Sequence, residues 1–155
     1  MSRRLKQIAI IFIVVIAVAA AAQLIRPELT NPPTDPSRTI QAHMDGVKGF
    51  VSILDRSCSD CHSNDTRWPW FAQIAPASWL VAYGVTSGRK AVNFSDWASY
   101  PPEQQRALLS ASCNDVSTGK MPGVYALLRP ETKLSTSDIE TICAAARQAT
   151  QGASR

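Results

Sequence analysis

Five consecutive residues carry the strongest chemical signal in the sequence: Cys58, Ser59, Asp60, Cys61 and His62. Two thiols three positions apart, followed directly by an imidazole, are typical of c-type haem attachment. Each thiol adds to one vinyl group of the porphyrin, and the turn of backbone between the sulfurs matches the separation of the vinyls. The adjacent imidazole is then placed to bind the iron as proximal ligand. The motif therefore predicts one covalently attached haem c, held by Cys58, Cys61 and His62.

Two other interpretations of this motif fit the sequence less well. A thiol-disulfide oxidoreductase would use Cys58 and Cys61 within a thioredoxin-like fold, but the βαβ pattern of that fold does not occur in the sequence. A structural zinc site would need one further ligand, and the adjacent Cys61 and His62 fit zinc geometry poorly.

A second stretch, residues 119–123 with the sequence GKMPG, supplies a candidate for the sixth iron ligand. Met121 stands in a loop that Pro122 restricts and glycines flank, so its thioether is well suited to reach the iron. By residue type alone, Met121 would fill a gap in the core. A haem that needs a sixth ligand favours ligation, and Met/His ligation raises the potential of a c-type haem. His43 and Met44 are the spare candidates.

The N-terminus predicts a membrane anchor. Residues 7–25 form a run of 19 residues without a charge, and as a helix this run spans roughly 28 Å. Arg3, Arg4 and Lys6 precede it, so the N-terminus is expected in the cytoplasm and the remainder outside the cytoplasmic membrane. The alternative for residues 1–25 is a cleaved signal peptide, because the alanines at 19–22 offer cleavage sites. Both interpretations deliver the domain to the periplasm or cell exterior, where disulfides persist.

The charge distribution does not indicate nucleic-acid binding. The formal net charge is +4, but Arg3, Arg4, Lys6 and Arg26 flank the apolar run. From residue 27 onward there are 12 basic and 12 acidic residues. The positive excess therefore reflects membrane topology.

The rest of the sequence predicts an all-α, c-type cytochrome-like domain around one haem, with no strand pattern or internal repeat. Residues 26–43 are expected to be a proline-rich spacer and residues 44–150 the haem-binding domain. Apolar spacing and helix-start signals predict helices over 45–56, 77–91, 101–116 and 136–149. Ser135 is expected to cap the last helix together with Asp138, and that helix is expected to pack on the first one. Gly84 and Gly88 weaken the prediction of the helix over 77–91, because glycine is unfavourable inside a helix.

Cys113 and Cys143 remain after haem attachment, and they lie in two of the predicted helices. In an exported domain such a pair is expected to form a disulfide, which would close a loop containing Met121. Cross-linking a loop of this length contributes roughly 3–4 kcal/mol. Two buried free thiols are the alternative, because the sequence does not fix the separation of the Cα atoms.

Residues 24–150 resemble the bacterial haem-binding domain family, whose members are small, usually membrane-anchored proteins similar to c-type cytochromes. The resemblance rests on the Cys-x-x-Cys-His motif, on Trp68-Pro69-Trp70 and on Met121-Pro122, which occur in the family order. It implies haem on Cys58 and Cys61, His62 as proximal ligand, and Met121 at the position of the family methionine. The family usually has an acidic residue before that methionine, where this chain has Lys120.

These observations predict a membrane-anchored monohaem cytochrome that transfers single electrons on the periplasmic side and is not an enzyme. Its partners are expected to be redox proteins whose identity the sequence does not reveal. The alternative is a haem-based sensor or peroxidase-like enzyme, which keeps one face of the iron open or binds its sixth ligand weakly. Acid–base catalysis has little support, because His43 is the only histidine besides His62.

Overall fold

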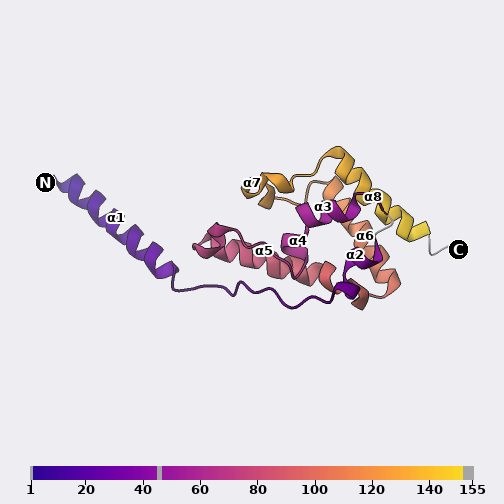
Figure 1. Ribbon diagram of the computed structural model, residues 1–155. Helices are drawn as coiled ribbons and strands as arrows, with labels where there is room; N and C mark the ends of the chain where they lie inside the picture. The colour runs from indigo at the N-terminus through magenta and orange to yellow at the C-terminus, as the bar shows by residue number, and fades with distance from the viewer. Residues whose placement is uncertain (1, 45–46, 152–155) are drawn as a thin grey trace. The chain divides into compact units, whose positions relative to one another are not determined.

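The computed structural model describes residues 2–44 and 47–151, and it contains helices and no strand within those ranges (Figure 1). The prediction of an all-α protein is therefore confirmed. The α-helices are α1 Arg3–Ala22, α2 Ile40–His43, α3 Phe50–Ser57, α4 Ser59–His62, α5 Ala77–Ala91, α6 Pro102–Ser117, α7 Tyr125–Leu128 and α8 Thr136–Gln151. The 3₁₀ helices are η1 Pro36–Arg38, η2 Trp70–Gln73, η3 Phe94–Ser99 and η4 Pro130–Thr132.

The chain forms two compact units. The first lies within Met1–Thr30 and Trp68–Gly84, and the second within Asn31–Arg67 and Val85–Arg155. In the first unit, α1 is long and apolar enough to cross a membrane and has no buried residue. Such a helix near the N-terminus is either a membrane span or a signal sequence.

The core of the second unit lies where α3, α6 and α8 pack together (Figure 1). Contacts between α6 and α8 dominate, and α8 also contacts α3, the helix on which it was expected to pack. Ala145 and Ala146 of α8 are buried, and their small side chains permit α8 to pack closely on its neighbouring helices. A disulfide joins Cys113 of α6 to Cys143 of α8, with a Cα–Cα distance of 4.8 Å.

The start of α8 has the capping arrangement expected from the sequence. The backbone N–H of Asp138 donates to Ser135 Oγ over 3.2 Å, and the backbone N–H of Ser135 donates to Asp138 Oδ2 over 2.8 Å. The same carboxylate oxygen accepts a hydrogen bond from Arg56 of α3 at 2.8 Å. These bonds, the Ser135 backbone bond first, hold the pKa of Asp138 below its usual value.

We expect Asp138→Ala to lower the free energy of unfolding by about 1 kcal/mol, as loss of a helix cap does. A depressed carboxyl pKa adds stability above the unfolded pKa, and this stability is lost as the pH falls through the folded value. Urea unfolding at neutral pH should therefore separate the variant from the wild type, and the difference should shrink at acidic pH. Glu140→Ala, at an exposed position of α8, should change little; an equal loss there would contradict the capping role.

The structure departs from the expected organisation at the spacer and at the first domain helix. Ile40, within the expected spacer 26–43, is fully buried in the core, and α2 and η1 pack on η3. The helix expected over 45–56 begins at Phe50, because Gly49 before it has a φ of 83°, in the left-handed region that interrupts helices. Residues 45 and 46 lie outside the described ranges. The chain thus enters the second unit before residue 44.

Candidate functional site

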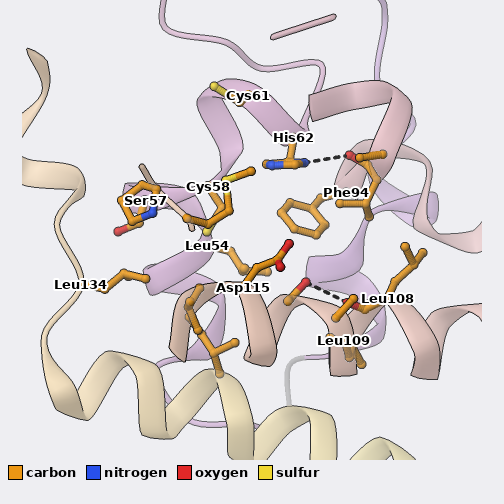
Figure 2. A pocket seen from close by; sticks show the side chains of 18 of the residues that line it. Leu54, Ser57, Cys58, Cys61, His62, Phe94, Leu108, Leu109, Asp115 and Leu134 are labelled. Carbon is orange, nitrogen blue, oxygen red and sulfur yellow. Dashed lines mark hydrogen bonds between the residues drawn. The ribbon is translucent and has the colours of Figure 1, made fainter. Parts of the chain in front are cut away.

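A cavity of about 280 Å³ lies within the second unit, between the Cys-x-x-Cys-His segment and α6 (Figure 2). Its wall is mostly apolar and includes Phe50, Leu54, Phe94, Leu108, Leu109, Val116, Leu134 and Ile142. Cys58, Cys61, His62 and Met121 also line it, so all four residues predicted to hold a haem face the same space. A pocket with apolar walls and a few chemically reactive groups is the usual form of a cofactor site.

The ring of His62 is oriented by a backbone carbonyl. Its Nδ1 lies 3.2 Å from the carbonyl oxygen of Val92, just past the end of α5, and Figure 2 draws this bond as a dashed line. With Nδ1–H donating to a carbonyl, Nε2 keeps the lone pair needed to bind a metal. Burial lowers the pKa of His62, while hydrogen bonds to the backbone of Val92 and Gly88 partly oppose the shift. The imidazole is therefore neutral at neutral pH, which is the form that ligates iron.

The two thiols of the motif are partly buried. Burial is the main cause that raises the pKa of Cys58 to about 12 and that of Cys61 to about 11. Thiol-disulfide catalysts work the opposite way, because their attacking cysteine has a lowered pKa. Over residues 2–44 and 47–151 there is also no strand and no cluster of three or more His, Cys, Asp and Glu side chains that could hold a metal ion. The oxidoreductase and zinc interpretations therefore gain no support.

Gly88 allows α5 to pack directly against the motif. A Cβ atom built on Gly88 would lie 2.3 Å from the carbonyl oxygen of Cys61 and 2.9 Å from its carbonyl carbon. Both neighbouring atoms belong to the backbone and cannot move aside as a flexible side chain could. The absence of a side chain at Gly88 thus permits the close approach of α5 to Cys61. The sequence showed Gly88 only as a weak point in a helix.

The Met121 loop is fastened to the end of α6 through Asp115. The backbone N–H of Met121 donates to the Asp115 carbonyl over 3.1 Å, and Lys120 Nζ donates to both carboxylate oxygens over 3.2 Å. Lys120, which departs from the family pattern, therefore pairs with an acid one helical turn earlier. Asp115 also lines the cavity. Met121 is 40% exposed.

Asp60 lies inside the motif and links it to the segment after Met121. It is 4% exposed, and Oδ1 accepts from the backbone N–H and Nε of Arg67 at 3.1 and 2.9 Å. On its other side, Oδ2 accepts from the hydroxyl of Tyr125 at 3.3 Å and lies 3.7 Å from a guanidinium nitrogen of Arg129. Burial and the Asp60 charge raise the pKa of Tyr125 to about 12. Nothing in the residue types had indicated this network.

Several candidates considered from the sequence lie away from the cavity. His43 ends α2, and Met44 packs against the core, but neither lines the space that Met121 lines. Phe50, Phe94 and Tyr125 supply the aromatic side chains of its wall. Phe94 packs on His62 with a ring-centroid distance of 5.8 Å, and the two rings are tilted by 41°.

Comparison with known protein families agrees with this geometry. The haem-binding domain family matches residues 17–148, which is most of the chain. This chain belongs to the haem-binding domain family. No curated protein and no solved structure shows significant similarity to it. Membership in the haem-binding domain family supports a haem cofactor, and the cavity is the place where the chain offers ligands for one.

The residues around the cavity fit a haem. Apolar side chains cover its walls, as a porphyrin ring requires, and His62 has its Nδ1 occupied so that Nε2 remains for iron. The two cysteines stand on the same side of the space as His62, three positions apart in sequence. Met121 supplies a soft thioether from a different segment of the chain.

Proposed function

We propose that this haem-binding domain is a monohaem c-type cytochrome that transfers single electrons. The observation that carries the proposal is that Cys58, Cys61, His62 and Met121 all line one apolar cavity. In this proposal the two sulfurs form thioethers with the haem, His62 is the proximal ligand and Met121 the distal one. When bound, the haem supplies a couple between ferric and ferrous iron, whose potential the axial pair sets.

The surrounding residues support a carrier more than a catalyst. The Val92 carbonyl fixes the orientation of His62, and the Asp115 bonds hold the backbone of the Met121 loop. Apolar side chains of the cavity wall, such as Leu109 and Ile142, would keep water from a bound haem. A carrier needs a site that is already arranged for both oxidation states, and these contacts provide that arrangement. A peroxidase-like enzyme or gas sensor would instead need a vacant iron face.

We also propose that α1 remains attached as a single-pass anchor in the cytoplasmic membrane, with the haem domain in the periplasm or outside the cell. Positive charges precede α1 and support a cytoplasmic N-terminus. The Gln23 side chain, directly after α1, accepts a hydrogen bond from the backbone N–H of Ala75 and donates one to its carbonyl. Residues at the end of the helix are therefore built into the fold, which supports retention of α1. Electrons would then pass to redox proteins at the same membrane.

Covalent attachment can be tested on a denaturing gel. Protein matured in an exporting host should keep its haem through denaturation, and its visible spectrum should change between the oxidised and reduced states. Replacing both Cys58 and Cys61 by alanine should remove the haem stain, because no thioether can form. Replacing both Cys113 and Cys143 by serine is the matched control and should leave the stain in place. A properly exported wild-type protein without haem stain would refute the proposal.

A further inference from the structure

The first unit carries an exposed aromatic surface whose role the proposed function leaves open. Residues 68–84 contain no charged residue. Five large apolar side chains within this stretch are exposed: Trp70, Ile74, Trp79, Leu80 and Tyr83. Trp70 is 77% exposed and Tyr83 is 72% exposed, which is unusual for large aromatic side chains in a folded unit. Contiguous exposed apolar surface marks an interaction site. We call these five residues the aromatic surface.

Hydrogen bonds tie this surface to the end of α1. Gln23 exchanges two bonds with the backbone of Ala75, at 3.1 and 3.2 Å. The indole N–H of Trp79 donates to the carbonyl of Ile25 over 2.7 Å. These bonds fix Ala75, which follows η2, and the first turn of α5 beside the residues that come directly after α1. The aromatic surface therefore stands at the level where α1 ends.

That level is the headgroup region if α1 spans a bilayer. Its 20 residues measure about 30 Å as a helix, the thickness of one hydrocarbon core. Gln23 then lies at the boundary, with Leu24 and Ile25 86% and 68% exposed next to it. Tryptophan and tyrosine concentrate at this boundary, because their rings are apolar and their N–H or O–H groups seek water and headgroups.

We propose that the aromatic surface inserts into the outer headgroup region of the bilayer that α1 spans. The first unit would then contact the membrane through both α1 and the aromatic surface. The occupant is the phospholipid interface, because the surface is continuous with the end of α1. This inference rests on the proposed anchor. It assigns residues 70–83, far from α1 in sequence, to the membrane interface.

The test is photo-cross-linking of the full-length protein in phospholipid nanodiscs. The lipid carries a diazirine at the top of one acyl chain, and adducts are mapped by mass spectrometry. We expect adducts on α1 and on the aromatic surface. We expect few adducts at Val124 and Leu127, which are 64% and 73% exposed and apolar but belong to the second unit. The variant Trp70→Ser/Tyr83→Ser should lose adducts at the surface and keep those on α1.

The outcomes separate this inference from the anchor. Adducts on α1 without adducts on 70–83 would overturn the membrane contact and leave the anchor intact. Equal labelling of Val124 and Leu127 would also overturn it, because the surface would then not be distinguished from other exposed apolar side chains. A mature protein that lacks α1 would refute the anchor and, with it, the insertion of the aromatic surface beside α1.

Discussion

Replacing Met121 by alanine should open the ferrous haem to carbon monoxide and lower its reduction potential. The thioether lines the cavity and, as a soft ligand, favours ferrous iron. Its removal leaves a free coordination position. The shift should be a sizeable part of the roughly 0.8 V over which axial ligands set haem potentials. The weak sulfur-to-iron charge-transfer band of the ferric wild type should also disappear. Visible spectroscopy, ligand titration and redox titration measure these three changes.

Met44→Ala is the matched control for this experiment. Met44 is a partly buried methionine that packs on the core of the same unit but does not line the cavity. Its removal should leave the charge-transfer band, the potential and the response to carbon monoxide unchanged. Fast and complete binding of carbon monoxide by the wild-type ferrous protein would contradict the assignment of Met121. The sensor or enzyme alternative would then take precedence over electron transfer.

Gly88→Ala should destabilise the second unit strongly for so small a change. The added methyl group would lie 2.3 Å from the Cys61 carbonyl oxygen, so either α5 or the motif must move. Overpacking of this kind costs about 1–3 kcal/mol, and alanine in a helix returns up to ~1 kcal/mol. We expect a net loss near the upper part of that range, because both contacting atoms are backbone. Urea unfolding of the haem-loaded protein measures it.

Gly84→Ala, on the same helix, should change the free energy of unfolding in the opposite direction. A Cβ on Gly84 meets no atom within 4 Å, so only the helix preference remains and stability should rise by up to ~1 kcal/mol. If the two alanine variants changed the free energy of unfolding equally, the contact between Gly88 and Cys61 would not be important. Displacement of Cys61 by Gly88→Ala should also reduce the yield of covalent haem.

Apolar spacing and capping residues predicted α5 and the start of α8 well, because both signals lie within the helix itself. Helix α5 occupies the predicted range 77–91, and α8 begins where Ser135 and Asp138 form the predicted cap. The position of Ile40 in the core could not be predicted, because a proline-rich segment gives no periodic signal. The late start of α3 likewise depends on the positive φ of Gly49, because residue type alone does not show which glycines adopt that conformation.

The chemistry of the site was visible in the sequence, whereas its supporting contacts were not. Cys58, Cys61, His62 and Met121 were recognised by type and spacing, and they share one cavity. Asp60 occupies a position of the motif that tolerates many residues, so nothing predicted its bonds to Arg67 and Tyr125. Tyr125 is 65 residues from Asp60 along the chain, and only the folded arrangement of α4 and α7 brings these two together.

The four cysteines fall into two pairs with different fates, and this imposes a sorting problem during biogenesis. Four thiols allow three complete pairings, and an oxidising compartment favours all of them. If haem is attached as proposed, Cys58 and Cys61 must stay reduced until it is added, while Cys113 and Cys143 must be oxidised to form their disulfide. Cys143 is 8% exposed and Cys113 is partly buried, so the fold limits thiolate attack on the finished bridge. A reductant that reopens a premature Cys58–Cys61 bond would therefore spare the bridge between α6 and α8 only once these two helices have packed together.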